Sequence, residues 1–246
     1  MLNFVPSSFM QTAGLACVSV VLLVAAACGD SDSDSNGVPD AASSVAADAA
    51  TGEPDGSTGA CARLTDADVN GGVTLPAGCY VVEDDLTVDD GILALEAGVE
   101  IDFASNIGLT ITGEGSLYAD ASGGDTIVVQ GTENATGSRD FWKGIRFDGS
   151  FNNTNELNNV HLIDGGATSW ISITDPSVIF LTGTSYLEVT DTTISNSNSY
   201  GIEASNNSVL AGCSGLEFEG IEAEDQIFTN RSNEDNICDG DWFAED

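Results

Sequence analysis

From about residue 61 onwards, short runs of alternating apolar and polar residues recur along the chain. The runs are rich in β-branched side chains and are separated by turn residues. Alternation with a period of two is typical of half-buried strands, and no window beyond the first thirty residues has the 3.6-residue spacing of an amphipathic helix. We therefore predict strands at 86–88, 92–95, 99–103, 109–112, 116–118, 126–129, 145–147, 160–163, 178–181, 187–189, 193–194 and around Ile202.

The spacing of these runs indicates repeated coils. Leu86 and Leu109 lie 23 residues apart, and Leu93 and Leu117 lie 24 apart. A repeat of this size holds about three short strands, and one coil cannot bury its own apolar face, so the coils must stack. A sandwich of hairpins would show longer strands joined by two-residue turns. We therefore predict an all-β fold, a parallel β-helix.

Several ordered motifs resemble a known family. They are Leu93–Phe103, Gly115–Ala119, Asp125–Val129, Trp142–Phe147 and Leu157–Ile163. In this order they are similar to right-handed parallel β-helix proteins of the pectin-lyase-like type, over about 79–213, although Ala97 replaces the family's usual proline. The resemblance implies that fold and little about activity, because the fold hosts lyases, hydrolases, adhesins and inert surface proteins.

The N-terminal segment has the pattern of an export signal. No charged side chain precedes Asp30, and an apolar run ends in three alanines before Cys28. The run is too short for a membrane span, which needs ~20 residues. It resembles a bacterial lipobox, which implies a signal peptide over 1–27, a lipidated Cys28, an acidic flexible tether over 28–60 and a β-helix domain over 61–246. Secretion after cleavage near Ala27, or an uncleaved anchor, remains the alternative.

The charge balance limits the partners. Forty acidic residues face five basic ones, a formal net charge of −35 in 246 residues. Such a surface repels nucleic acid and anionic lipid headgroups. We expect a monomer attached to the membrane through its lipid, with a polysaccharide or a cell-surface protein as the possible ligand. Because Gly29 follows the cysteine, the resemblance to the sorting rule implies the outer membrane, with secretion as second choice.

Four cysteines lie in the predicted domain: Cys61, Cys79, Cys213 and Cys238. Three pairings are possible, with free thiols as the alternative. The local pairing, Cys61–Cys79 and Cys213–Cys238, would close one loop at each end of the solenoid, where an unpaired rung needs a cover.

Calcium is the one cofactor that the acidic motifs suggest. The segment 32–40 resembles a thrombospondin type 3 repeat, with oxygen ligands at Asp32, Asp34, Asn36 and Asp40. A second set around Cys238 consists of Asp235, Asp239 and Asp241. Diffuse screening of the charge by salt is the alternative to a defined site.

Asparagines crowd the expected turns, which suits the left-handed backbone of β-helix corners. They include Asn152, Asn153, Asn155, Asn158, Asn159, Asn196, Asn198, Asn206 and Asn207.

Catalytic motifs are sparse. His161, the chain's single histidine, alternates with apolar neighbours and should point outward from its strand. Arg139, Trp142, Lys143 and Arg146 gather basic groups around an indole that could bind an anionic sugar by stacking. The alternative is that these bases balance nearby carboxylates.

Two function classes therefore remain. The favoured one is a non-catalytic cell-envelope lipoprotein that displays an acidic β-helix surface for binding or structural roles. The alternative is a calcium-assisted polysaccharide lyase or glycoside hydrolase on the same fold. The sequence lacks the cluster of bases and acids that such enzymes need, which favours the first class.

Overall fold

The computed structural model describes residues 60–132, 138–152, 154–172, 174–222, 226–229 and 237–238. The chain divides into two units, Met1–Thr51 and Gly52–Asp246, and the described residues all belong to the second. The predicted signal peptide, Cys28 and the tether up to residue 59 lie outside the described residues.

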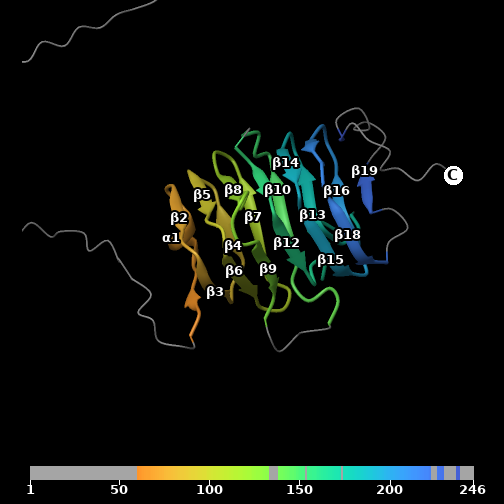
Figure 1. The fold of residues 1–246 in the computed structure, drawn as a ribbon. Helices are drawn as coiled ribbons and strands as arrows, with labels where there is room; N and C mark the ends of the chain where they lie inside the picture. The colour runs from red at the N-terminus through yellow and green to blue at the C-terminus, as the bar shows by residue number, and fades with distance from the viewer. Residues whose placement is uncertain are drawn as a thin grey trace, which may run out of the picture. The chain divides into compact units, whose positions relative to one another are not determined.

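The second unit is built from three sheets whose strands all pair in parallel, as Figure 1 shows. Sheet A contains β1 (Ala62–Arg63), β3 (Gly78–Val82), β6 (Val99–Phe103), β9 (Ile127–Gly131), β12 (Val160–Ile163), β15 (Thr193–Ser197) and β18 (Glu217–Ile221). Sheet B contains β2 (Val73–Leu75), β5 (Ile92–Leu95), β8 (Ser116–Asp120), β11 (Glu156–Asn158), β14 (Tyr186–Thr190) and β17 (Val209–Gly212). Sheet C contains β4 (Leu86–Val88), β7 (Gly108–Thr112), β10 (Gly144–Asp148), β13 (Ser177–Thr182), β16 (Tyr200–Ala204) and β19 (Ile227–Thr229).

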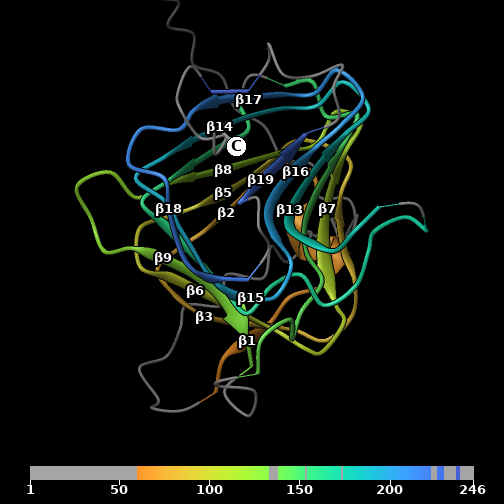
Figure 2. The same ribbon diagram turned by 90° about the vertical axis from the view of Figure 1, so that its right-hand side faces the viewer.

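From β3 onwards the chain visits sheets A, C and B in turn before it returns to sheet A one rung further along. Viewed from the end, the three sheets enclose a common interior (Figure 2). The register confirms the predicted repeat, because Leu86 pairs with Leu109 and Leu93 pairs with Leu117. The predicted parallel β-helix is therefore confirmed.

The interior is filled by columns of inward-facing apolar side chains. In sheet C, Ile111, Phe147 and Leu181 are register partners on successive rungs, and all three are fully buried. Stacked columns of this kind let each coil bury apolar area against the next, at about 25 cal/mol per Å². This is why a single coil would be unstable and the stack is stable.

Asparagines occupy corners as predicted. Asn159, Asn206 and Asn207 lie between strands and have positive φ angles between 54° and 60°, whereas Asn196, with a φ of 58°, lies inside β15. Asn155 directly precedes β11, and its side chain is fully buried. At this position the side chain, rather than the backbone, makes the hydrogen bonds to the neighbouring strands. Its Oδ1 accepts the Leu117 N–H at 2.9 Å, and its Nδ2 donates to the carbonyl of Tyr186 at 3.0 Å. One side chain thus joins β8 to β14.

Both ends of the described stack carry the predicted disulfides. Cys61 is joined to Cys79 near β1, and Cys213 is joined to Cys238 beside β17. At the first end the short helix α1 (Asp66–Val69) packs against β4 and buries Val69. The sequence pattern did not predict this helix, which has only one turn and so shows no periodicity.

Candidate functional site

The predicted sugar-binding cluster does not form an open binding site in the structure. Trp142 is fully buried, and its ring stacks on Phe103 with centroids 4.8 Å apart. Its indole N–H donates to the carbonyl of Ile163 at 2.7 Å. This placement leaves the indole no free face on which a sugar could stack, so Trp142 belongs to the core.

The three bases of the same cluster are each engaged by an acid. Arg146 contacts Asp148 at 2.5 Å. Lys143 lies 3.4 Å from Asp85 and 4.9 Å from the centroid of the Trp170 ring.

Arg139 pairs with Glu222 and also donates to the Asn198 side chain at 3.1 Å. Arg63, the remaining base in the described part of the chain, pairs with Glu83 and Asp84. The arrangement matches the alternative interpretation, in which bases balance local carboxylates, and an anionic ligand would have to displace these acids.

His161 lies on the outer side of sheet A, as the alternation predicted. Its Nε2 is 2.8 Å from the hydroxyl oxygen of Ser195. Partial burial lowers the pKa of His161, and the charge of Glu219 acts in the opposite direction. A neutral histidine beside a serine is one requirement of nucleophilic catalysis. Neither residue lines either of the two hollows described below, so the pair has no substrate cavity there.

The calcium predictions concern residues that lie outside the described part of the chain. These residues are Asp32, Asp34, Asn36, Asp40, Asp235, Asp239 and Asp241. Among the described residues, Cys61, Cys79 and Asp102 bring three potential metal ligands together. The two sulfurs form a disulfide, so they are not available as thiolate ligands.

The outer side of sheet B differs from the rest of the surface by its exposed apolar residues. In the described part of the chain, the large hydrophobic side chains that are exposed are Ile92 at 40%, Tyr118 at 37% and Phe151 at 61%. Ile92 and Tyr118 point outward from β5 and β8, and Phe151 lies in the turn that leads to β11. These groups make this side a candidate interaction surface.

Carboxylates stack beside these apolar groups. Glu156 on β11 is the register partner of Tyr118 on one side and of Glu188 on the other. Partial desolvation raises the pKa of Glu156, and the charges of Asp120 and Glu188 raise it further. A hydrogen bond with the Asn158 side chain acts in the opposite direction on the pKa of Glu156. The pKa of Tyr186 is raised by burial and by the charges of Glu188 and Glu156. Among the described ion pairs, none joins a Lys or Arg to either of these glutamates, which lie on adjacent rungs ~4.8 Å apart.

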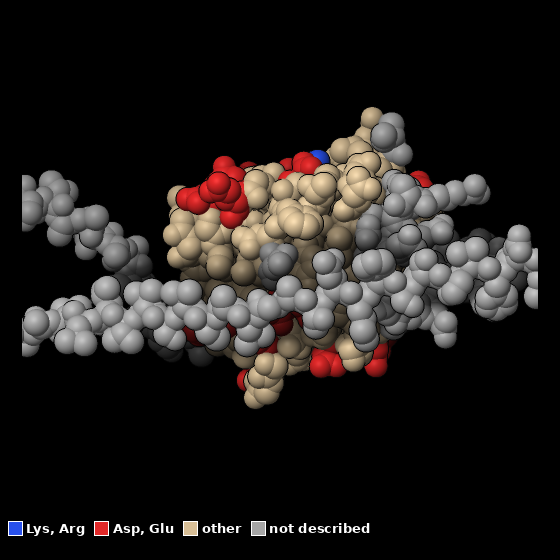
Figure 3. Space-filling model, turned by 90° about the horizontal axis from the view of Figure 1, so that it is seen from above, with Lys and Arg blue, Asp and Glu red and all other residues tan. Residues whose placement is uncertain are grey.

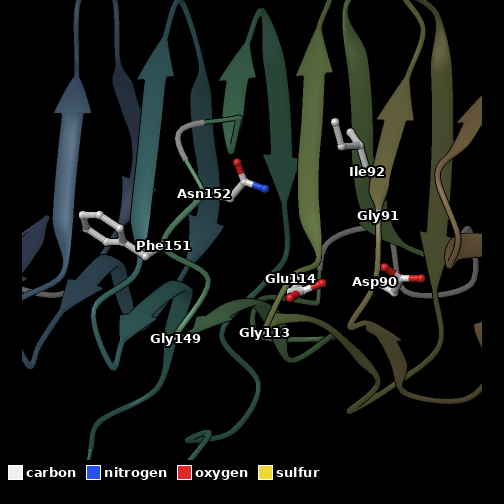
Figure 4. A pocket seen from close by; sticks show the side chains of 8 residues that line it. All are labelled: Asp90, Gly91, Ile92, Gly113, Glu114, Gly149, Phe151 and Asn152. Carbon is white, nitrogen blue, oxygen red and sulfur yellow. The ribbon is translucent and has the colours of Figure 1, made fainter.

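A hollow of about 560 Å³ lies where the turns from sheet C lead into the strands β5, β8 and β11 of sheet B. It is lined by Asp90, Gly91, Ile92, Gly113, Glu114, Gly149, Phe151 and Asn152. Figure 4 shows the side chains of Asn152 and Ile92 on opposite sides of this hollow, with Glu114 and Asp90 below them, while the Phe151 ring points away from the other four.

The hollow forms where two short turns lie next to a longer one. The turns at Gly91 and Gly113 are short, and that at Gly149 runs on to Asn155 before β11 begins. The next strands start close to the preceding coil: a Cβ on Gly115 would lie 2.1 Å from the Val88 carbonyl oxygen. A hollow of this volume is within the range of small-ligand sites.

Sheet C carries an unusual buried carboxyl group. Glu203 on β16 is only 3% exposed, and its Oε2 has no hydrogen-bond partner. Its register neighbours are Phe180 and Phe228, which supply no polar group. Burial raises the pKa of Glu203 to about 7, and the charge of Asp175 contributes. Asp175 also lines a second hollow of about 320 Å³.

Acidic side chains far outnumber basic ones on the described surface. In Figure 3 the acidic side chains gather at several places over the visible face, whereas basic atoms are hardly seen. The four described bases lie in or beside sheets A and C, and their acid partners are given above. The outer side of sheet B therefore has an acidic and aromatic character with no Lys or Arg on its described strands.

No family model, curated protein or solved structure matches this chain. Within the described ranges, no helix has the length and apolar character needed to cross a membrane. The sequence pattern placed Tyr118 and Glu188 in strands but assigned them no role. The signal for their role was available in the alternation, because an aromatic or acidic residue opposite buried neighbours must face outward.

Proposed function

We propose that this chain is a non-catalytic protein of the bacterial cell envelope. Its lipid anchor is Cys28, its class is a pectin-lyase-like β-helix lipoprotein, and its place is the outer membrane. In this proposal the acidic β-helix is displayed at the end of the tether and binds a partner through the outer side of sheet B.

One observation carries the proposal: the exposed large hydrophobic residues of the described chain gather at sheet B, whereas its bases are paired elsewhere. A lyase or hydrolase acting on an acidic polysaccharide needs free positive charge near its acids to bind the substrate and stabilise developing charge. Arg139, Lys143 and Arg146 are already paired with acids. Binding through apolar and acidic groups needs no such charge, and sheet B offers both.

The test is a depolymerisation assay run with the purified full chain. A panel of acidic and neutral polysaccharides is incubated with and without calcium, and reducing ends and unsaturated products are measured. The proposal predicts no products from any substrate. Products that disappear in Arg139→Ala or Arg146→Ala would establish the enzymatic alternative instead.

A further inference from the structure

The outer side of sheet B and the hollow at the starts of its strands form one connected surface. Ile92 belongs to both, because it points outward from β5 and also lines the hollow. We call this surface the acid–aromatic face. Its members are Asp90, Ile92, Glu114, Tyr118, Phe151, Glu156 and Glu188.

Electrostatics make this face receptive to positive charge. Glu156 and Glu188 are register partners, so their carboxylates leave adjacent rungs on the same side of the sheet. Asp90 and Glu114 add two exposed acids at the hollow. Each described base is bound to an acid on another part of the molecule. An external cation placed between the two glutamates would therefore relieve a repulsion that the described residues leave unrelieved.

The aromatic groups favour an organic cation over a simple ion. Tyr118 is the register neighbour of Glu156, and more than a third of its side chain is exposed. A Lys or Arg side chain can contact a carboxylate with its charge while its apolar stem lies along a ring. A calcium ion gains nothing from a ring or from the exposed Ile92 and Phe151. The combination of acids with apolar contacts is therefore complementary to a peptide.

We propose that the acid–aromatic face docks a basic, Lys/Arg-rich segment of a partner protein. Basic side chains of that segment lie between Glu156 and Glu188 and beside Asp90 and Glu114. Its apolar parts contact Ile92 and Tyr118. This inference rests on the proposed function, since it names the class of partner for the same binding surface.

The test measures binding of a fluorescein-labelled oligolysine peptide to the full chain by fluorescence anisotropy. An oligoglutamate peptide and a labelled neutral oligosaccharide serve as comparison probes. The double variant Glu156→Gln with Glu188→Gln removes two charges from the face. Glu217→Gln with Glu219→Gln removes two charges from exposed positions of sheet A and is the matched control. Circular dichroism checks that each variant keeps its sheets.

We expect oligolysine to bind, and the sheet B double variant to weaken binding by about tenfold, since two partly exposed ion pairs are lost. The sheet A control should change affinity by less than about twofold. Tyr118→Ala should weaken binding by about fivefold, because truncation of an interface aromatic removes both packing and cation–π contact.

Three results would overturn the docking proposal. Equal weakening in both double variants would show that oligolysine responds only to net charge. Absence of oligolysine binding would exclude a basic partner. Binding of the neutral oligosaccharide in its place, lost in Tyr118→Ala, would retain the binding function while replacing the partner class. The non-catalytic character of the proposed function is tested separately, because it fails if the chain depolymerises a polysaccharide.

Discussion

Replacing Glu203 with glutamine should remove a large pH dependence from the stability of the domain. The carboxyl group is buried between Phe180 and Phe228 with one unpartnered oxygen, and its pKa rises from 4.5 to about 7. Between these two values the folded state holds a proton that the unfolded state has lost. Stability from this group is therefore complete below pH ~4.5 and is lost as pH rises through the folded pKa.

The magnitude follows from the shift. Each pKa unit corresponds to about 1.4 kcal/mol, so ionisation of Glu203 costs about 3 kcal/mol of unfolding free energy by about pH 8. Glutamine cannot ionise and is close in shape to the protonated acid. The unfolding free energy of Glu203→Gln minus that of the wild type should thus increase by about 3 kcal/mol from about pH 4 to about pH 8.

Urea unfolding followed by tryptophan fluorescence at a series of pH values measures this difference. Taking the difference cancels the titration of the other acids, which is large in so acidic a chain. Asp175→Asn is the second arm, because loss of that charge should lower the pKa of Glu203 and move the transition to lower pH. If wild type and Glu203→Gln give parallel curves over the whole range, Glu203 is not a buried proton-holding group.

Further predictions concern the corner, the first end of the stack and the anchor. Asn155→Ala should lower the unfolding free energy by about 3 kcal/mol, because it leaves buried backbone groups of β8 and β14 without a hydrogen-bond partner. Asn152 is only half-buried, so Asn152→Ala should have little effect in the same urea assay. Replacing Cys61 and Cys79 by serine opens a link spanning 18 residues and should cost about 3 kcal/mol, and an unchanged unfolding midpoint would show that the link does not constrain the unfolded chain. Metabolic labelling with a fatty-acid analogue should tag the wild type but miss Cys28→Ala, and equal labelling would disprove the anchor.

The repeat was predictable because the spacing and the alternation of apolar residues can be read directly along the chain. Leu86 and Leu109 show the coil length directly, and the alternation around His161 gives its outward direction. Seven strands were not predicted: β1, β2, β3, β11, β17, β18 and β19. Five of them have only two to four residues, which give few positions for a pattern, whereas β3 and β18 have five residues and were missed all the same. Trp142 was misjudged because it precedes β10 and pairs only by an isolated bridge with Gly165, so no alternation fixed its direction.

The surface features depend on contacts between coils, which the sequence does not show. Glu203 alternates with Ile202 and Ala204, so the pattern indicates an outward, solvated acid. Its burial depends on Phe180 and Phe228, which lie more than twenty residues away on either side. The stacking of Glu156 on Glu188 likewise follows from the length of the intervening coil. Register, rather than composition, creates both features.

Carbodiimide footprinting of the carboxylates tests the central claim most directly, since it reports which acids a bound partner covers. The full chain is labelled with and without saturating oligolysine, and the modification of each acid is measured by mass spectrometry. The account predicts protection of Glu156, Glu188 and Glu114, with Glu217 and Glu219 labelled equally in both samples. Protection spread evenly over both sheets, or confined to Glu217 and Glu219, would contradict the assignment of the binding surface to sheet B.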